Sequence, residues 1–347
     1  MYRRHFFQKA GLSVLASLLA MHKAKANADD TRAWHKPPRL REGTTVALIA
    51  PASPASEEKL EKALSNLAML GLKVKEGASL RARHGYLAGT DEARLADLHQ
   101  AFADPEVEAV WCVRGGYGIT RLLPYVNYQL IKKNPKLFIG YSDVTALHLA
   151  IGQKTGLTTF HGPVAASDFP ENTLLHFKSV LMNPATPYVI AAPGQGAELP
   201  GEEYQPFTLS PGRATGRLTG GNLSLLAALA GTPFEPSFRR KIVFIEEVGE
   251  QPYRVDRLLT QLLQATDLKQ AAGIVLGVFA DCAAKNPEFS LTLPDTLRDR
   301  LSSLGIPVFY GLPFGHVAHQ ATFPYGMQAE MDAEGRTLTL LEAGVKN

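Results

Sequence analysis

Strand-like and helix-like segments alternate from Thr44 to about residue 165, and this alternation constrains the fold more than any other feature of the sequence. The strand-like runs are "TTVALIA" (44–50), "GLKVKEG" (71–77), "VEAVWCVRGGYG" (107–118) and "KLFIGYSD" (136–143). Amphipathic helices are predicted between them, the first capped by Ser56 and ending at Gly71. Regular alternation of this kind is typical of a parallel sheet covered by helices on both faces. We therefore expect an N-terminal, flavodoxin-like α/β domain over residues 40–165.

The second half of the chain follows a different pattern. Residues 163–211 are rich in proline and glycine and only weakly periodic, so a linker is predicted at 166–207. Beyond it, strands are again followed by helices, as in "RKIVFIEEVGE" (240–250) and the helix that Pro252 opens. We expect a second α/β domain, richer in strands, over residues 208–345.

The first 28 residues have the pattern of an export signal. A basic start, "MYRRHFFQK", precedes a 12-residue apolar run and then small residues that suit a signal peptidase. The apolar run is shorter than the roughly 18 to 20 residues that span a bilayer, so cleavage is expected instead of stable membrane insertion. Cleavage after Ala28 is favoured, and cleavage after Ala26 is the alternative. The paired Arg3 and Arg4 resemble a twin-arginine signal, which indicates export of a folded protein to the periplasm.

Charge and cysteine content exclude some classes of function. The formal charge is +3, but residues 1–28 contain five basic residues and no acid, so the remainder carries −2. The mature chain is therefore not expected to bind nucleic acid. Cys112 and Cys282 each lie in an apolar run, which favours two buried thiols, with a disulfide as the alternative.

Ser142 lies where the strand at 136–143 turns into a helix. Ligands of parallel α/β sheets bind at the carboxyl ends of the strands, where a serine can act as a nucleophile and helix amides can stabilise negative charge. Gly140 matches the first glycine of G-x-S-x-G, but Val144 replaces the second. From these residues alone, a helix cap formed by Ser142 or Asp143 is favoured, and a nucleophile is the alternative.

A glycine turn follows the strand at 107–113. Gly115, Gly116 and Gly118 would let the backbone approach a ligand and direct amides toward an oxyanion or a carboxylate. The stretch fits neither G-x-G-x-x-G with its later acid nor a P-loop, so no nucleotide cofactor is predicted. A plain tight turn is the alternative interpretation.

Two later segments contain groups that could activate a serine. Glu246 or Glu247 closes a predicted strand, and His316 lies in a glycine-flanked loop after another. A nucleophilic serine needs such a base and a third group that fixes the tautomer of the base. His316 and His319 could also suggest a metal site, but no acid or cysteine lies near them and H-E-x-x-H is absent, so no metal is predicted.

Together these segments resemble one family, the serine LD-carboxypeptidases of bacterial murein recycling, whose relatives include the microcin C immunity peptidases. The resemblance extends from Thr44 to Gly326. It rests, in this order, on "ALIAPASP", "RGGYG", "IGYSDVTALHLA", "FHGPV", "GRLTGGNLSLLAALAGTP", "FIEEVGEQPYRVDRLLTQL" and "GLPFGH". It implies a two-domain α/β fold, with the serine on the N-terminal domain and the glutamate and histidine on the C-terminal one.

The resemblance also implies the roles of the site residues. Ser142 is the implied nucleophile, His316 its base and Glu246 the residue that orients His316, while Glu247 has only adjacency in its favour. The implied substrate is the murein tetrapeptide stem, and the bond joins the L-centre of meso-diaminopimelate or lysine to terminal D-alanine. Hydrolysis would pass through an acyl-enzyme.

Further candidates surround this triad. Amides of Asp143 and of Gly115 or Gly116 are expected to hold the oxyanion. Candidates for binding the substrate are Arg114, Tyr117, Gly221 and Asn222, with Arg217 and Arg254 as further candidates, by residue type, for its terminal carboxylate.

Family members typically act in the cytoplasm, whereas the export signal predicts a periplasmic enzyme that trims released muropeptides or the sacculus itself. By resemblance, the protein is expected to need no cofactor and to form a homodimer. Two alternatives stay open: a peptidase of the same fold that cleaves a peptide antibiotic, and a periplasmic murein-peptide binding protein without activity. The sequence leaves the third residue of the stem and the glycan requirement undetermined.

Overall fold

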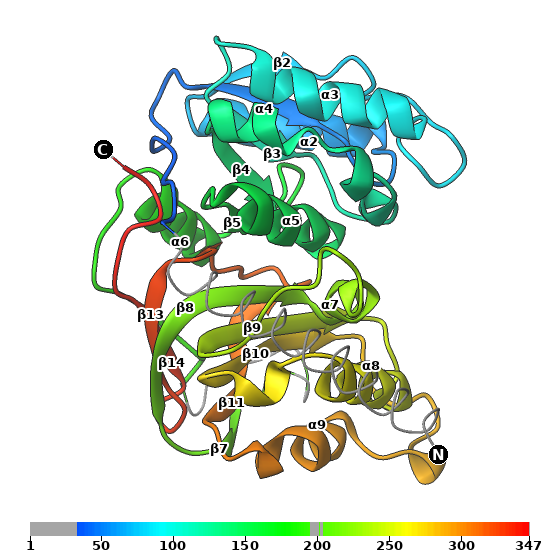
Figure 1. Cartoon of the computed structure of the whole chain (residues 1–347), viewed down its shortest axis with the longest axis vertical. Coiled ribbons are helices and arrows are strands. Elements are labelled where there is room, and N and C mark those ends of the chain that lie inside the picture. The colour runs from blue at the N-terminus through cyan, green and yellow to red at the C-terminus, as the bar shows by residue number, and fades with distance from the viewer. Residues whose placement is uncertain (1–32, 195–200, 202–203, 347) are drawn as a thin grey trace, which may run out of the picture. The chain divides into compact units, whose positions relative to one another are not determined.

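The structure is a computed structural model that describes residues 33–194, 201 and 204–346. The predicted signal segment, residues 1–28, lies outside the described residues. From Trp34 onward the chain forms a single unit that contains two sheets (Figure 1). Among the described residues, no helix is both long and apolar enough to cross a membrane.

The first sheet has the strand order β12-β5-β4-β3-β1-β2. Its strands are β1 (Thr45–Ile49), β2 (Lys73–Glu76), β3 (Ala109–Cys112), β4 (Leu137–Gly140), β5 (Phe160–His161) and β12 (Phe323–Pro324). The first five are parallel and follow the flavodoxin-like order 2-1-3-4-5. The predicted flavodoxin-like sheet is confirmed, and β12 adds an antiparallel strand from the C-terminal half of the chain.

Helices cover both faces of this sheet. They are α2 (Glu57–Met69), α3 (Asp91–Ala103), α4 (Tyr128–Lys133), α5 (Thr145–Thr155) and α6 (Glu171–Leu181). From β1 the chain first moves outward to β2 and then turns back across the sheet to β3, β4 and β5. Right-handed connections therefore place α2 on one face of the sheet and α3, α4 and α5 on the other. Phe138 of β4 stacks on Phe102 of α3, with 6.2 Å between ring centroids. Trp111 of β3 points to the other face and stacks on Phe177 of α6, at 5.0 Å.

Local sequence sets where these helices begin. Ser56 Oγ accepts a hydrogen bond from the Lys59 amide at 3.3 Å, which confirms the predicted cap of α2. Thr90 caps α3 in the same way through the amide of Ala93. Both side chains satisfy a first-turn N–H that would otherwise lack a partner.

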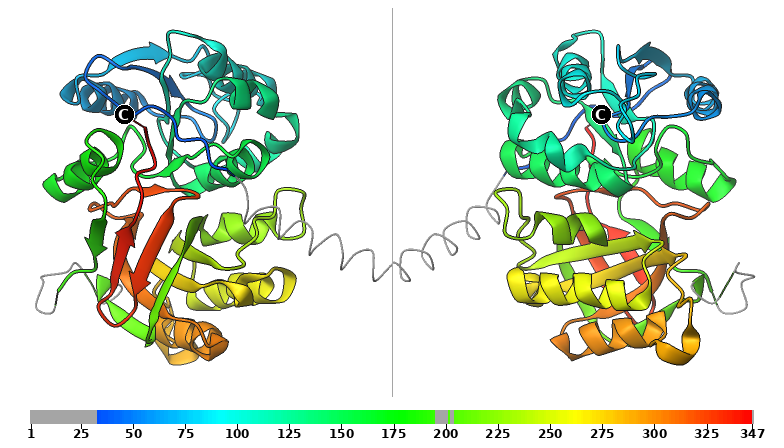
Figure 2. Two further views of the ribbon diagram at one scale, coloured as in Figure 1. Left: turned by 60° about the vertical axis from the view of Figure 1, so that its left-hand side comes forward. Right: turned by 90° about the vertical axis from the view of Figure 1, so that its right-hand side faces the viewer.

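The second sheet is mixed, with the order β6-β14-β13-β8-β9-β10-β11-β7. Its strands are β6 (Tyr188–Ala191), β7 (Phe207–Ser210), β8 (Arg213–Asn222), β9 (Lys241–Val248), β10 (Gly273–Ala280), β11 (Val308–Gly315), β13 (Gln328–Asp332) and β14 (Thr337–Leu340). The four central strands, β8 to β11, are parallel, and the flanking strands are antiparallel. This is the strand-rich α/β lobe expected from the sequence. Its last strands, β13 and β14, are the red arrows in Figure 2.

Three helices lie along this sheet, side by side (Figures 1 and 2): α7 (Leu223–Leu229), α8 (Pro252–Ala265) and α9 (Leu293–Leu301). Pro252 opens α8 as predicted. Short 3-10 turns complete the fold: η1 (Ile119–Arg121), η2 (Leu123–Tyr125), η3 (Ser142–Val144), η5 (Leu268–Gln270), η6 (Pro287–Phe289) and η7 (Ser302–Leu304).

The segment 166–207, predicted as a linker, contains regular structure. Helix α6 packs on the first sheet, and β6 forms the edge of the second. A linker was predicted because the segment is rich in proline and glycine. Helix α6 nevertheless forms, because Phe177 and Leu181 give it a buried face.

The start of α5 joins the two sheets. Thr145 Oγ1 accepts a hydrogen bond from the Asn222 amide, at the end of β8, at 3.1 Å. Gly221, with φ 126°, lets the two backbones approach, because a Cβ there would lie 2.5 Å from the Thr145 side chain. The carboxyl ends of β4 and β8 therefore meet at the same place.

Candidate active site

Ser142 occupies a sharp turn between β4 and α5. Its φ is 64°, in the left-handed region that residues other than glycine rarely adopt. Gly140 keeps the turn tight, since a Cβ there would lie 3.0 Å from Val144. Neither η3 nor α5 has a side-chain cap, and Tyr141 precedes the first turn. The interpretation of Ser142 or Asp143 as a helix cap is therefore wrong.

A continuous chain of hydrogen bonds begins at the Ser142 hydroxyl. Ser142 Oγ lies 3.1 Å from His316 Nε2, and His316 Nδ1 lies 2.8 Å from Glu246 Oε2. An Nδ1–H that donates to the carboxylate leaves the Nε2 lone pair free to accept the serine proton. Glu246 lies near the end of β9 and is fully buried, while His316 directly follows β11. The structure thus brings together three side chains from distant parts of the chain.

Glu247 points away from this chain of hydrogen bonds, because successive side chains on a strand face opposite sides. Its carboxylate accepts hydrogen bonds from Asn222 Nδ2, the Ser224 amide and the Ser224 hydroxyl at 3.0, 2.8 and 2.6 Å. It therefore holds the start of α7. Of the two adjacent acids, only Glu246 contacts His316.

Glu246 also determines the basicity of His316. Burial lowers the pKa of the imidazole, but the hydrogen bond that His316 donates to Glu246 and the charge of Glu246, with a smaller contribution from Glu247, raise it more. The net pKa of His316 lies above its usual value of 6.5. Gly315, with φ 113°, keeps this contact close, since a Cβ there would lie 3.1 Å from Glu246 Cβ.

This raised pKa predicts the pH dependence of any reaction in which His316 acts as base. The imidazole can accept a proton only when neutral, so activity is lost as pH falls through the His316 pKa. We expect kcat/KM to rise with pH and to level off above an apparent pKa higher than 6.5. A pH–rate profile at low substrate concentration measures this value, and a limb below pH 6 would contradict the assignment.

The glycine turn lies directly against Ser142. A Cβ on Gly115 would come within 2.9 Å of Ser142 Cβ and 3.2 Å of its Oγ. Gly116, with φ 126°, packs onto Ser53, whose hydroxyl accepts the Tyr117 amide at 3.1 Å. Among the described residues, no acceptor takes the N–H of Gly115, Gly116 or Asp143. These amides are therefore available to an oxyanion.

Gly115→Ala should reduce activity through this contact. The φ of Gly115 is not positive, so its backbone tolerates alanine, and the added methyl must displace Ser142 or the turn. A displacement of about 1 Å at a reacting group costs roughly 100-fold, and we expect a fall of that order in kcat. Gly194→Ala is the matched control, because a Cβ there meets nothing within 4 Å. Equal activity of the two variants would show that the turn does not constrain the serine.

Asp143, next to Ser142, binds the end of the glycine turn. Its carboxylate accepts the Ile119 amide at 2.9 Å, which joins η3 to the end of the glycine turn. Burial raises the pKa of Asp143 to about 6, although this hydrogen bond and the charge of Arg94 oppose the shift. The amides expected to form the oxyanion hole thus belong to one connected unit.

The other residues predicted to bind substrate have different roles in the structure. Arg114 donates to the carbonyls of Gly115 and Pro54, both at 3.1 Å, and so supports the turn. The Asn222 side chain caps α7 and bonds Glu247, while Gly221 packs on Thr145. Tyr117 is exposed beside the turn.

The two further arginines have other partners. Arg217 donates to the Gly326 carbonyl at 2.6 Å and lies 3.5 Å from Glu342. Arg254 of α8 donates to the Tyr253 hydroxyl and to Glu250, which lies just before the helix. Neither is brought to the serine by any contact in the described part of the chain.

Sequence reasoning missed two residues near the site. The ring of Tyr141 lies 4.9 Å from that of His316, and burial, with the charge of Glu246 second, raises the pKa of Tyr141 to about 12. Thr145 anchors α5 to β8. Both flank Ser142 within the "YSDVT" run, so adjacency to the predicted nucleophile was the available signal.

Metal-binding groups do not gather at this site. Within residues 33–194, 201 and 204–346, no three His, Cys, Asp or Glu side chains are placed to hold a metal ion, and His319 is exposed. Cys112 and Cys282 are both free and buried.

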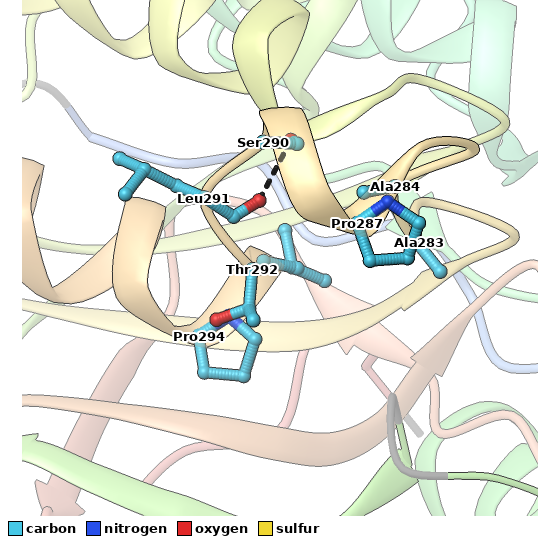
Figure 3. Close-up of a pocket in the computed structure, with 8 residues that line it drawn as sticks. Ala283, Ala284, Pro287, Ser290, Leu291, Thr292 and Pro294 are labelled. Carbon is cyan, nitrogen blue, oxygen red and sulfur yellow. Dashed lines mark hydrogen bonds between the residues drawn. The ribbon is translucent and has the colours of Figure 1, made fainter.

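A cavity of about 440 Å³ lies elsewhere, beside α9 (Figure 3). Its lining is Ala283, Ala284, Pro287, Ser290, Leu291, Thr292, Leu293 and Pro294. None of these side chains titrates, and Ser290 Oγ donates to the Leu291 carbonyl at 2.8 Å. The lining of this cavity therefore contains no base that could activate a hydroxyl.

Comparison with known proteins shows which family the chain belongs to. Residues 46–162 match the model of the LD-carboxypeptidase N-terminal domain, and residues 215–331 match that of the C-terminal domain. A probable murein peptide carboxypeptidase of Bacillus subtilis is 44% identical, over 90% of this chain and 95% of its own.

Solved structures share the whole fold. A muramoyltetrapeptide carboxypeptidase from Oxalobacter formigenes has a TM-score of 0.75 at 32% identity, covering 86% of this chain and 99% of its own. An MccF-like protein from Bacillus anthracis has a TM-score of 0.76 at 30% identity, covering 88% and 98%. Two matching domain models and relatives of nearly full length show that the chain belongs to the serine LD-carboxypeptidase family, as its sequence motifs predicted.

Proposed function

We propose that this protein releases terminal D-alanine from murein tetrapeptide stems, with Ser142 as its nucleophile. The observation that carries the proposal is the hydrogen-bonded chain from Ser142 through His316 to buried Glu246. The strained φ of Ser142 supports the same role, since backbone strain at a strand-to-helix turn exposes a nucleophile. The names of the Bacillus and Oxalobacter relatives supply the substrate class.

The geometry supports a reaction in two stages. Ser142 Oγ attacks the carbonyl carbon of the scissile bond while His316 Nε2 takes the hydroxyl proton. Glu246 holds His316 through Nδ1–H and stabilises the imidazolium that forms. His316 then gives the proton to the amine of departing D-alanine. Water, deprotonated by His316, hydrolyses the acyl-enzyme and releases the tripeptide.

The oxyanion of each tetrahedral intermediate would lie at the glycine turn. The amides of Asp143 and of Gly115 or Gly116 have no acceptor among the described residues, and Gly115 lies against the serine. Donors that are fixed before the reaction lower the barrier without reorganising, typically by about 3 to 4 kcal/mol for one such group.

The test is mass spectrometry of a defined murein tetrapeptide after incubation with the mature protein. We expect conversion to the tripeptide with release of free D-alanine. Absence of D-alanine release from both meso-diaminopimelate and lysine stems would contradict the proposed substrate.

A second candidate has a specific observation in its favour. The solved Bacillus anthracis structure carries the name MccF-like, and its identity to this chain, 30%, is near that of the Oxalobacter enzyme. The same triad would then cleave an amide bond in a peptide antibiotic of the microcin C type. Incubating both substrates with one enzyme preparation and comparing kcat/KM decides between them.

We also propose that the protein works in the periplasm, on the basis of its predicted twin-arginine signal. A fusion of residues 1–28 to a reporter that is active only after export tests this. Replacing Arg3 and Arg4 by lysine should stop export, and a reporter that stays in the cytoplasm with the native signal would contradict the proposal.

A further inference from the structure

Two exposed tyrosines face each other beside the glycine turn. Tyr86 is 64% exposed and Tyr117 is 52% exposed, and their ring centroids lie 5.5 Å apart at 68°. Large aromatic side chains exposed together are unusual on a protein surface and mark binding sites. The triad does not use this pair.

The backbone around the pair is fixed. The Tyr117 amide donates to Ser53 Oγ, and Gly118, with φ 116°, packs against Leu87, the residue after Tyr86. The His84 and Leu87 backbones also bond each other in both directions, at 2.8 and 3.0 Å. Both rings are therefore presented by ordered turns, which reduces the entropy lost when a ligand binds.

The pair lies where this fold places ligands. Ser53 follows β1, Tyr86 follows β2 and Tyr117 follows β3, all at the carboxyl edge of the first sheet. The strand order reverses between β1 and β3, and open α/β sheets bind ligands at that switch point. The same turn contacts the nucleophile through Gly115, and Gly115, Gly116 and Tyr117 are each at least partly exposed along it.

The surroundings favour an uncharged ligand. Arg121 lies near both rings, and its charge is already paired with that of Asp91 at 2.8 Å. A phosphate would need an unpaired cation, whereas a sugar needs an apolar face to stack on and a polar tip to bond its hydroxyl and acetamido groups. Tyrosine offers both.

From this geometry we infer that Tyr86 and Tyr117 bind the amino sugar to which the murein peptide stem is attached, so that the preferred substrate is a glycan-bearing muropeptide. This inference rests on the proposed function. Three stem residues precede the scissile bond and span roughly 10 Å when extended. Tyr117 is two residues, at most about 7 Å of chain, from Gly115 at the serine. The sugar can therefore reach the rings.

Calorimetry in a Ser142→Ala background tests this without turnover. The two ligands are a disaccharide-tetrapeptide and the same tetrapeptide without sugar, and the readout is the ratio of their Kd values. We expect the sugar to tighten binding, and Tyr86→Ala or Tyr117→Ala to reduce that gain about three- to tenfold. Tyr86→Phe, which keeps the ring, should retain most of it. Tyr125→Ala is the control, since Tyr125 is 69% exposed but belongs to no ring pair among the described residues.

The inference is overturned if the sugar gives no gain in affinity, or if both alanine variants keep the ratio of the parent protein. Failure of the proposed function has a different signature, namely no D-alanine release by the protein with Ser142 intact. A gain from the sugar that both alanine variants lose, together with absent release, would support a glycopeptide-binding site and reject the catalytic proposal.

Discussion

Ser142→Ala is expected to lower kcat by about 10⁴- to 10⁶-fold while leaving the Kd for murein tetrapeptide nearly unchanged. Alanine removes the oxygen that His316 Nε2 is placed to deprotonate, at 3.1 Å, and adds no atom that would disturb the glycine turn. Measuring D-alanine release together with calorimetric affinity separates the two effects. Wild-type turnover by this variant would reject the triad.

Ser142→Gly is a useful companion variant. It should be as inactive as the alanine variant but more stable, by about 1 kcal/mol, because a φ of 64° suits glycine and strains every other residue. Thermal unfolding of the two variants measures this difference. Equal stability would show that the turn does not strain the serine backbone.

Glu246→Gln is expected to lower kcat by about 10³- to 10⁴-fold with little loss of stability. Glutamine has the shape of glutamate but no charge, and its amide can hold His316 in the tautomer whose Nε2 carries a proton. The charge of Glu246 also keeps the His316 pKa raised, so its loss should move the acid limb of the pH–rate profile to lower pH. Steady-state kinetics across pH 5 to about 8 would record both changes.

Glu247→Gln provides the matched control, since it alters the adjacent carboxylate on the opposite face of β9. Glu247 binds Asn222 and Ser224 at the start of α7, so its replacement should lower the melting temperature, with a cost of about 1 to 3 kcal/mol. The folded variant should retain kcat within a few-fold. A reversal, in which the Glu247 variant loses turnover and the Glu246 variant does not, would exchange their roles.

Periodicity and motif order predicted much of the architecture. The alternating pattern from Thr44 indicated the parallel sheet, because strands buried on both faces are continuously apolar. The return of β12 to the first sheet could not be predicted, since two residues at Phe323–Pro324 carry no strand periodicity. Helix α6 was hidden by the proline and glycine on either side of it.

The candidate site, like the fold, was predicted only in part. The family resemblance identified Ser142, His316 and Glu246, and the coordinates agree with its choice of acid, since Glu246 contacts His316 whereas Glu247 binds Asn222. The local sequence favoured a helix cap at Ser142, because serine is a common cap and the sequence does not reveal the positive φ of this residue. Asn222 was a candidate for binding substrate, yet its side chain is occupied by the α7 cap, a contact that depends on how β8 and β9 pair.

The split of this site between two sheets has a consequence for how activity arises. The serine and its base are 174 residues apart, and the histidine follows one of the last strands of the second sheet. A chain that has formed only the parallel strands β1 to β5 contains Ser142, but it lacks His316 and Glu246, which come later in the sequence. If the proposed triad is correct, chains that end before β9 and β11 should therefore lack hydrolytic activity.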